Sequence, residues 1–349
     1  MKQRTRVEET MTMKLRYLAA AALGAAALLA APLAQAADVD MAAAKKEGKV
    51  TWYTSTPIKT AQQLAELFEK QTGIHVELFR SGGSAILRRF MQEHTAGLNA
   101  ADVMTTSDPA NSNKLAAQGV FVPFKPDDFD KVPAAGKDPN GAWVAQRLNM
   151  MVIYVRTDTV KPEDYPKSWA DATNAKYKGK LAMTDPSFTA LQLMVVSTLS
   201  HKIGWDYYKK LRANDIMIVQ SNQQVLDTIK RGERPIALGA LDSYAAAARK
   251  QGHKIKSLYP SDGTFIIPSP TAIIKGAPHP NAAKAFANFM LSKPAQELFP
   301  KNGGYAARTD VDPPADSPKL GDVKAMPVDY AQIEKETAGI KKQFNEIFQ

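Results

Sequence analysis

Short apolar segments alternate along this chain with amphipathic segments of helical periodicity, and this alternation constrains the fold more than any other feature. In the first part of the chain, the pattern predicts three consecutive strands, at residues 49–54, 74–80 and 102–106. The helices that follow them are predicted to end near Gly73, Gly97 and Gly119, since helices commonly end at a glycine. The pattern therefore predicts an α/β fold with mostly parallel sheets flanked by helices.

The middle of the chain repeats this plan and predicts a second body. Its predicted strands span residues 180–184, 216–220 and 235–241. Two extended segments, 144–156 and 264–274, separate the blocks, and both are long for single strands. The second contains Pro268 and Pro270, which we do not expect in a central ladder. We therefore interpret both segments as crossings between two lobes.

This interpretation divides the chain into a leader, two lobes and a tail. We expect lobe 1 to comprise residues 37–145 and 263–310, and lobe 2 to comprise residues 146–262. The C-terminal segment, 311–349, is expected to pack across the lobes.

The first 36 residues have the form of an export signal. Lys14 and Arg16 precede an apolar run over residues 17–33, and a small-x-small motif ends at Ala36. The run is mostly alanine and falls short of about 20 strongly apolar residues, which disfavours a membrane anchor. We expect cleavage before Ala37 and a soluble, exported protein.

Composition excludes several functional classes. The chain has no cysteine, so it can form neither disulfides nor thiolate metal sites. Its five histidines are dispersed, with no pair at metal-ligand spacing, and we expect no metal site and no catalytic set. The net charge is +10, yet no basic stretch is interleaved with aromatic residues, so nucleic acid is not an expected partner. Attraction to an anion and an ordinary solvated surface both remain open explanations of the charge.

Small polar residues follow nearly every predicted strand, where open parallel sheets bind their ligands. Helix capping and turn formation explain any one of them. Together they come from both lobes and predict a shared cleft. The candidate ligand-binding residues are Thr54, Ser55, Thr56, Ser81, Gly82, Gly83, Ser84, Ser107, Asp185, Ser187, Ser221, Asp242 and Tyr244.

Among these residues, the segment from Ser81 to Ser84 gives the most specific indication of a binding site. Two glycines allow close backbone approach, and the free N–H groups and dipole of a helix start favour an anion. A Gly-Gly turn with a serine cap is the alternative. Asp242 is expected either to bind a cationic or hydroxyl group of the ligand or to cap its helix.

Several segments resemble a known family. They are the opening VTWYTS, the stretch VLDTIKRGERPIAL, and IIKGAPHPNAAKAFANFMLSKPAQELF followed by GGYAARTDV. With the leader, they make the chain similar to the periplasmic solute-binding proteins of ABC transporters, in the branch that handles ferric iron, sugar phosphates and aminoethylphosphonate. The resemblance implies a type II two-lobed periplasmic-binding-protein fold that closes over one solute and docks on a membrane permease.

The resemblance also implies a binding protein rather than an enzyme. We expect a periplasmic monomer without a cofactor that captures a small organic anion, bearing a phosphate, phosphonate or carboxylate group. A periplasmic enzyme on the same scaffold is one alternative, with Asp108, Asp185 and Asp242 as candidate acids or bases.

A ferric-iron carrier is the other alternative. Iron-binding members of the family place a His in an early loop and adjacent tyrosines after the strand that corresponds to 235–241. The chain has no His beside Ser55 and one tyrosine, Tyr244, at the later junction. Tyr207 and Tyr208 are adjacent, but they lie in a predicted helix and are interpreted as a half-buried helix face.

Overall fold

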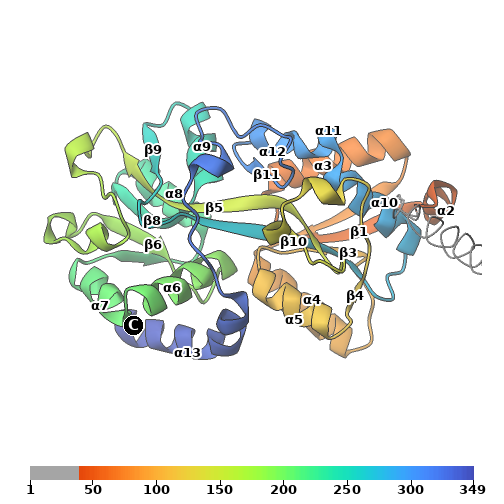
Figure 1. Cartoon of the computed structure of the whole chain (residues 1–349), viewed down its shortest axis with the longest axis horizontal. Coiled ribbons are helices and arrows are strands. Elements are labelled where there is room, and N and C mark those ends of the chain that lie inside the picture. The colour runs from red at the N-terminus through yellow and green to blue at the C-terminus, as the bar shows by residue number, and fades with distance from the viewer. Residues whose placement is uncertain (1–38) are drawn as a thin grey trace, which may run out of the picture. The chain divides into compact units, whose positions relative to one another are not determined.

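The computed structural model describes residues 39–349, so the predicted leader and its cleavage site lie outside the described residues. One mixed sheet of eleven strands runs through the described part (Figure 1). Its strands are β1 (Lys49–Thr54), β2 (His75–Arg80), β3 (Val103–Thr105), β4 (Phe121–Val122), β5 (Val144–Arg156), β6 (Leu181–Thr184), β7 (Met217–Val219), β8 (Ile236–Leu241), β9 (Ile255–Leu258), β10 (Phe265–Ile274) and β11 (Tyr305–Ala306).

The sheet is parallel at its two ends and antiparallel in its middle. The strand order is β2-β1-β3-β10-β5-β8-β6-β7, with β4 beside β10 and with β9 and β11 beside β5. β2, β1 and β3 pair in parallel, as do β8, β6 and β7. β10 and β5 pair antiparallel with each other and join the two parallel groups. The predicted combination of parallel sheets and crossing strands is confirmed.

The two prolines correct one sequence-based expectation. β10 continues through Pro268 and Pro270 as a strand in the middle of the sheet. The pairing register with β5 shifts between them, from Leu148 opposite Pro268 to Ala145 opposite Pro270. Because this irregularity interrupts the ladder where proline has no N–H to donate, the strand tolerates both residues.

Helices cover both faces of the sheet (Figure 1). The helices of the first half of the chain are α2 (Met41–Glu47), α3 (Ile58–Thr72), α4 (Gly83–Thr95) and α5 (Pro109–Ala117). Those of the second half are α6 (Ala190–Lys202), α7 (Trp205–Ala213), α8 (Asn222–Arg231), α9 (Asp242–Lys250), α10 (Pro280–Leu291), α11 (Lys293–Gln296), α12 (Leu298–Lys301) and α13 (Tyr330–Phe348). Single turns of 3-10 helix lie at 129–131, 134–136, 162–164, 170–173, 175–177 and 320–322.

Side-chain alternation on the strands builds a core on each face. Trp52 of β1 packs with Phe68 and Phe286 of α3 and α10, whereas its neighbour Tyr53 packs with Phe90 of α4 on the other face. This is the period of two that a strand imposes on its side chains. Polar loops follow the carboxyl ends of β1 and β3.

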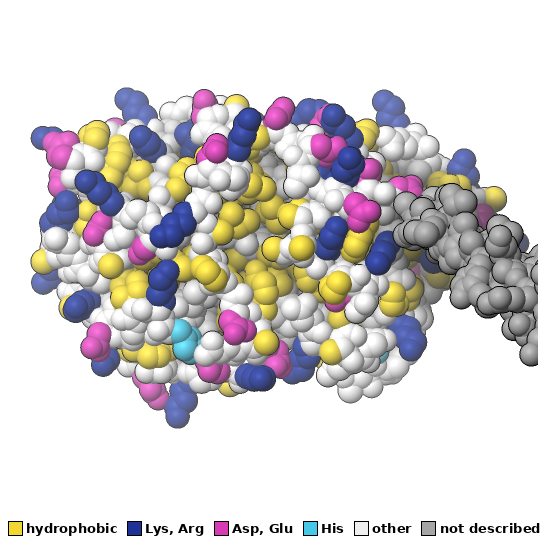
Figure 2. Space-filling view, in the orientation of Figure 1, with side chains coloured by type: hydrophobic (Ala, Val, Ile, Leu, Met, Phe, Trp, Pro, Cys, Tyr) yellow, Lys and Arg dark blue, Asp and Glu magenta, His cyan; other side chains and the backbone are white. Residues whose placement is uncertain are grey.

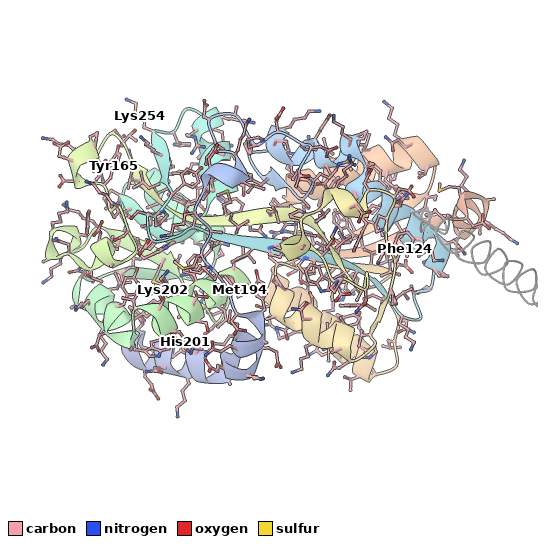
Figure 3. All side chains as sticks on the ribbon, viewed as in Figure 1. Phe124, Tyr165, Met194, His201, Lys202 and Lys254 are labelled. Carbon is pink, nitrogen blue, oxygen red and sulfur yellow. The ribbon has the colours of Figure 1, made fainter. Side chains whose placement is uncertain are left out.

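The C-terminal helix α13 packs on α6 and α7 and also on α5. Phe344 contacts Tyr208 of α7 with ring centroids 6.1 Å apart, and Lys114 of α5 pairs with Glu334 at 2.7 Å. His201, at the end of α6 (Figure 3), pairs with Glu336 of α13 at 2.9 Å. One helix therefore contacts elements that the chain places far apart in sequence.

Candidate functional site

Arg147 of β5 is a buried guanidinium without a carboxylate partner among the described residues. Its side chain is 6% exposed. It donates from Nη1 to Thr56 Oγ1 at 2.9 Å, from Nη2 to Ser107 Oγ at 3.0 Å and from Nε to Asn149 Oδ1 at 3.3 Å. All three acceptors are neutral, so the positive charge is hydrogen-bonded but not balanced.

These surroundings lower the pKa of the Arg147 guanidinium. Burial lowers the pKa of Arg147 to about 9, Tyr244 opposes that shift, and Arg80 adds to it. Burying a charge without a counter-charge is expensive, because the lost hydration is not replaced by an ion pair. A group of this kind is favoured at positions where a ligand supplies the opposite charge.

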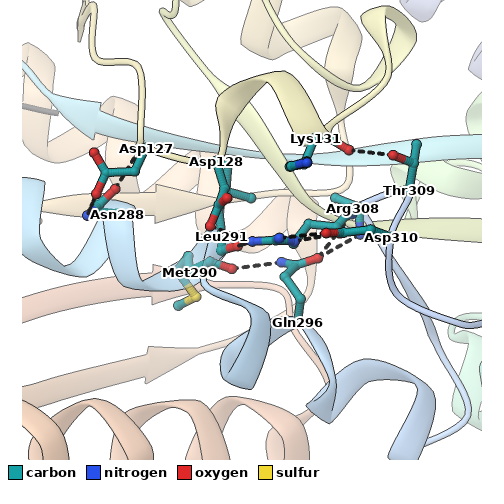
Figure 4. A network of polar contacts seen from close by, with 11 residues as sticks. Asp127, Asp128, Lys131, Asn288, Met290, Leu291, Gln296, Arg308, Thr309 and Asp310 are labelled. Atoms are coloured by element: carbon teal, nitrogen blue, oxygen red, sulfur yellow. Dashed lines mark hydrogen bonds and ion pairs between the residues drawn. The ribbon is translucent and has the colours of Figure 1, made fainter. Parts of the chain in front are cut away.

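Arg308 provides an internal comparison, since it is also 6% exposed. Figure 4 shows its guanidinium between Asp128 and Asp310, with Nε 2.8 Å from an oxygen of Asp310. These carboxylates raise the pKa of Arg308, with the Asp310 hydrogen bond as the largest cause. The fold therefore balances one buried arginine internally and leaves the other, Arg147, unbalanced.

Hydroxyl groups that follow the ends of β1 and β3, with one from the middle of β10, lie around Arg147. Ser107 Oγ lies 3.3 Å from Ser55 Oγ and 3.0 Å from Ser269 Oγ. Asn149 Nδ2 donates to Ser269 Oγ at 2.8 Å. Because hydroxyls both donate and accept, they can turn toward a ligand once it replaces their present partners. We call Arg147, Asn149, Ser55, Thr56, Ser107 and Ser269 the donor cluster.

The N-terminus of α4 lies beside the donor cluster. A Cβ built on Gly83 would stand 3.8 Å from the backbone nitrogen of Ser107 and 3.9 Å from Cβ of Ser55. The capping position is Gly82, and no side chain caps the helix. The serine-cap alternative for this segment is therefore wrong, and the first-turn N–H groups next to the cluster have no side-chain acceptor.

A cavity of about 350 Å³ is lined by Arg147 and Asn149 of the donor cluster. Tyr244 of α9 and four lysines line it with Arg147, and the described residues that line it include no Asp or Glu. We call it the basic pocket. The lysines are Lys59, Lys230, Lys250 and Lys301.

The structure brings part of the predicted site together. Ser55, Thr56 and Ser107 surround Arg147, Thr54 Oγ1 lies 2.7 Å from Thr56 Oγ1, and the Ser81 backbone N–H donates to the Thr54 carbonyl. Gly82, Gly83 and Ser84 lie in the start of α4 beside this group, and Tyr244 lines the basic pocket.

The remaining predicted residues make local contacts. Asp185 Oδ1 accepts from the Ser187 N–H at 2.7 Å, and Ser221 caps α8 by accepting from the Gln224 N–H at 3.1 Å. Asp242 begins α9 without capping it, so the capping alternative for this residue is wrong. Its carboxylate is fully buried, accepts hydrogen bonds from Ser257 and Tyr259, and has a pKa that burial raises.

Sequence reasoning missed Arg147, Asn149, Ser269 and the lysines of the basic pocket. One signal was present: Arg147 and Asn149 stand two positions apart in a mostly apolar extended segment, so they share one face of a strand. Charged residues are rarely buried unless they are paired or functional. The sequence alone does not reveal which of the two applies.

Two further observations concern metal binding: the burial of two adjacent tyrosines and the arrangement of the His, Asp and Glu side chains. Tyr207 and Tyr208 are 3% and 1% exposed, so the interpretation as a half-buried helix face is wrong. They pack inside the core around α7, where burial raises the pKa of both phenols. The described residues contain no group of three or more His, Asp or Glu side chains arranged to hold a metal ion.

A larger apolar hollow of about 1260 Å³ lies along β10, the loop before β5 and the segment before α13. Figure 2 shows hydrophobic side chains gathered in the middle of one face of the molecule. The residues that line the hollow include Trp143, Pro268, Met326 and Tyr330, and Leu148 borders both this hollow and the basic pocket.

None of the helices in residues 39–349 has the length and apolar character needed to cross a bilayer.

The chain belongs to the bacterial extracellular solute-binding protein family, whose family model matches residues 50–304. Among its relatives, a putative 2-aminoethylphosphonate-binding periplasmic protein of Salmonella typhimurium is 27% identical over 278 residues, covering 76% of this chain and 77% of that protein. An Fe(3+)-binding periplasmic protein of Serratia marcescens is 25% identical over 337 residues, covering 92% of this chain and 96% of that protein.

Solved structures show the same fold. The periplasmic binding protein AfuA from Actinobacillus pleuropneumoniae, with fructose-6-phosphate bound, superposes with a TM-score of 0.77 at 20% identity, covering 86% of this chain and 98% of that chain. Iron-bound HitA from Pseudomonas aeruginosa superposes with a TM-score of 0.76 at 20% identity, covering 85% of this chain and 99% of that chain. The predicted type II two-lobed fold is confirmed.

Proposed function

We propose that this chain is the periplasmic solute-binding component of an ABC importer and that it captures a small organic anion at Arg147. The observation that carries the proposal is the buried guanidinium with neutral partners only. A phosphate, phosphonate or carboxylate on the ligand supplies the missing negative charge. The α4 N-terminus and the hydroxyls of Ser55 and Ser107 supply further donors.

The expected affinity follows from a few strong contacts. Each hydrogen bond to a charged group contributes about 1.5–3 kcal/mol. Several such bonds, less the entropic cost of association, support a dissociation constant that is micromolar or tighter. Tyr244 lines the same pocket as Arg147 but belongs to helix α9, whereas Arg147 belongs to strand β5. Residues 37–145 with 263–310 would then close against residues 146–262, with the ligand between them.

Calorimetry with variants of β5 tests the proposal. Wild type, Arg147→Met and Arg156→Met are titrated with fructose 6-phosphate, 2-hydroxyethylphosphonate and inorganic phosphate. Arg156 stands in the same strand but pairs with Asp158 at 2.7 Å, which makes it the matched control. Loss of two charge-assisted bonds, about 3 kcal/mol, weakens binding roughly 100-fold in Arg147→Met. Equal affinity in all three proteins would remove Arg147 from the site.

The ferric-iron alternative has its own test. Relatives named for Fe(3+) make it worth testing, whereas in this chain the adjacent tyrosines Tyr207 and Tyr208 are core residues. Tyrosinate ligation gives a visible charge-transfer band. We expect purified protein mixed with Fe³⁺ to stay colourless and to retain no metal after desalting.

The contacts of the acids near the strand ends support a non-enzymatic role. Asp108 caps α5 through the Asn111 N–H at 3.1 Å, and burial raises the pKa of its carboxyl. Asp185 and Asp242 bond to groups of their own lobe, as described above. None of the three contacts the donor cluster through a hydrogen bond in the described residues. Among the described residues, the site therefore offers donors to an anion, and none of these three acids is bonded to its donor cluster.

Export and monomeric state complete the proposal. The relatives named as periplasmic support a location outside the cytoplasm, with cleavage between Ala36 and Ala37. N-terminal sequencing of protein recovered from the periplasm checks the cleavage position. We expect a monomer that docks on a membrane permease, and light scattering of the purified protein measures its mass.

A further inference from the structure

The charges on the basic pocket restrict the chemistry of the whole ligand. Its described lining residues include five cationic side chains and no anionic one. Lys59, at the start of α3, and Lys230, near the end of α8, form no ion pair within the described residues. These lysines come from separate elements, so their convergence with Arg147 is a property of the fold rather than of a basic stretch in the sequence.

Asp227, Asp242 and Glu297 each stand within two positions of a lining residue in the sequence, and each already has a partner. Asp227 of α8 accepts from Gln223 Nε2 at 2.9 Å. Glu297 lies 3.9 Å from Lys301 Nζ, and Asp242 accepts from Ser257 and Tyr259. None of the three is among the pocket's lining residues. A ligand in this pocket therefore meets ammonium, guanidinium, hydroxyl and amide groups.

An ammonium group on the ligand fits this environment poorly. Like charges about 4 Å apart repel by about 4 kcal/mol at the effective dielectric constant of a protein surface and by about 1 kcal/mol in water. The ammonium would also lose hydration without gaining a carboxylate partner. A hydroxyl avoids both penalties, and a carboxylate gains attraction to the lysines.

On the basis of the proposed function, we propose that the ligand places one anionic group on Arg147 and carries a hydroxyl or a second anionic group, but no ammonium, at its other end. The chain then selects phosphate esters, hydroxyalkylphosphonates or phosphonocarboxylates and discriminates against zwitterionic aminoalkylphosphonates. This separates it in ligand class from the relative named for 2-aminoethylphosphonate, to which it is 27% identical.

Three phosphonates with the same phosphorus–carbon–carbon skeleton test the proposal by calorimetry. They are 2-aminoethylphosphonate, 2-hydroxyethylphosphonate and phosphonoacetate, with fructose 6-phosphate as a larger hydroxylated phosphate ester. We expect phosphonoacetate to bind at least as tightly as the hydroxyl compound. The amino compound is expected to bind at least about fivefold more weakly than the hydroxyl compound, the factor that one unfavourable charge contact produces.

A variant locates the source of the discrimination. In Lys59→Gln/Lys230→Gln, the ratio of the two affinities measured on the same variant, hydroxyl compound over amino compound, should shrink toward one. Lys254→Gln/Lys256→Gln is the matched control because it removes two lysines that do not line the pocket. An unchanged ratio in the pocket variant would overturn the assignment to these lysines.

The outcomes separate this inference from the proposed function. If 2-aminoethylphosphonate binds as tightly as the hydroxyl compound or more tightly, the inference fails and anion binding at Arg147 stands. If none of the four anions binds at about 10 mM, a concentration that detects even very weak affinity, both fail together.

Discussion

Arg147 and Arg308 show how one residue type serves two purposes in one chain. Both are almost completely buried, but only Arg308 has carboxylates beside it. The charge of Arg308 is therefore balanced within the fold by two partly exposed carboxylates. Removing Arg147 strands no carboxylate among the described residues. Its charge is therefore available to a ligand.

The lowered pKa of Arg147 predicts how ligand affinity depends on pH. Because burial lowers its pKa to about 9, the guanidinium is charged at pH 7 and loses charge as the pH rises through that value. The second ionisation of a phosphate ester has a pKa near 6, so the charge of fructose 6-phosphate is constant above about pH 8. We expect affinity for fructose 6-phosphate to fall between pH 8 and pH 10, measured by calorimetry.

The same lowered pKa makes stability depend on pH in the opposite direction to ligand affinity. Above about pH 9 the unfolded chain holds this proton more tightly than the folded chain, so the contribution of Arg147 to stability rises with pH. A loss of affinity in this range is therefore not unfolding through this residue. Thermal melts of the same samples without ligand check that point, and affinity that rises up to pH 10 would contradict the prediction.

Two serines at helix starts separate ligand binding from capping. The Ser84 side chain makes no hydrogen bond to another described residue, whereas Ser221 Oγ caps α8. We expect Ser84→Ala to weaken anion binding several-fold without lowering the melting temperature. Ser221→Ala should cost about 1 kcal/mol of stability, the usual value of a cap. A lower melting temperature for Ser84→Ala with unchanged affinity would reverse the two roles.

Hydroxyl-rich strand ends could be predicted from the sequence because the strand pattern and the position of polar residues after it are local signals. Ser55, Thr56 and Ser107 were found in this way. Arg147 was not, since its importance depends on which groups surround it after folding. Ser269 belongs to the segment that the proline rule removed from the central sheet. Arg147 and Ser269 acquire their neighbours through the pairing of strands that are distant in sequence. The periodicity of the sequence does not predict that pairing.

At the scale of elements, the irregularities of the sheet have identifiable causes. The pairing of β5 with β8 shifts register between Val152 and Tyr154, opposite the stretch that contains Gly239. Gly239 has φ of +58°, which L-residues rarely adopt. A Cβ at this position would come within 2.7 Å of Gln192 Oε1 on α6. The bulge therefore requires glycine for two separate reasons.

Substitution at this bulge predicts a loss of stability. Gly239→Ala forces both backbone strain and a steric contact, and we expect it to lower the free energy of unfolding by about 1–3 kcal/mol. Gly339→Ala on α13 is the control because its added Cβ meets nothing within 4 Å and its φ is not positive. Alanine favours a helix over glycine, so this variant should gain up to about 1 kcal/mol. Urea titration of both variants tests whether the signs differ as expected.

At the scale of the whole molecule, one hydrophobic cluster joins elements from distant parts of the chain. It contains Ala110 of α5, Met151 of β5, Phe265 of β10 and Phe344 of α13. Short local contacts do not explain this grouping, because β5 and β10 pair across more than 100 residues of sequence. The alternation of strands and helices predicted the fold class. The shared core depends on strand order, which the sequence pattern leaves open.

This shared core predicts cooperative unfolding. We expect a single calorimetric transition whose van't Hoff and calorimetric enthalpies agree, rather than one transition for each proposed lobe. A bound anion at about 100 times its dissociation constant should raise the free energy of unfolding by about 2.7 kcal/mol and shift the transition as one peak. Two resolved peaks, only one of which responds to the anion, would show that the lobes unfold independently.

The neutral surroundings of Arg147 bear on how such a chain evolves. A change of Ser107 to Asp would give the guanidinium a permanent counter-charge within the fold. If Arg147 binds the ligand as proposed, that carboxylate would occupy the position of the ligand's anionic group and abolish binding. Selection for solute capture would therefore oppose a substitution that balances the buried charge.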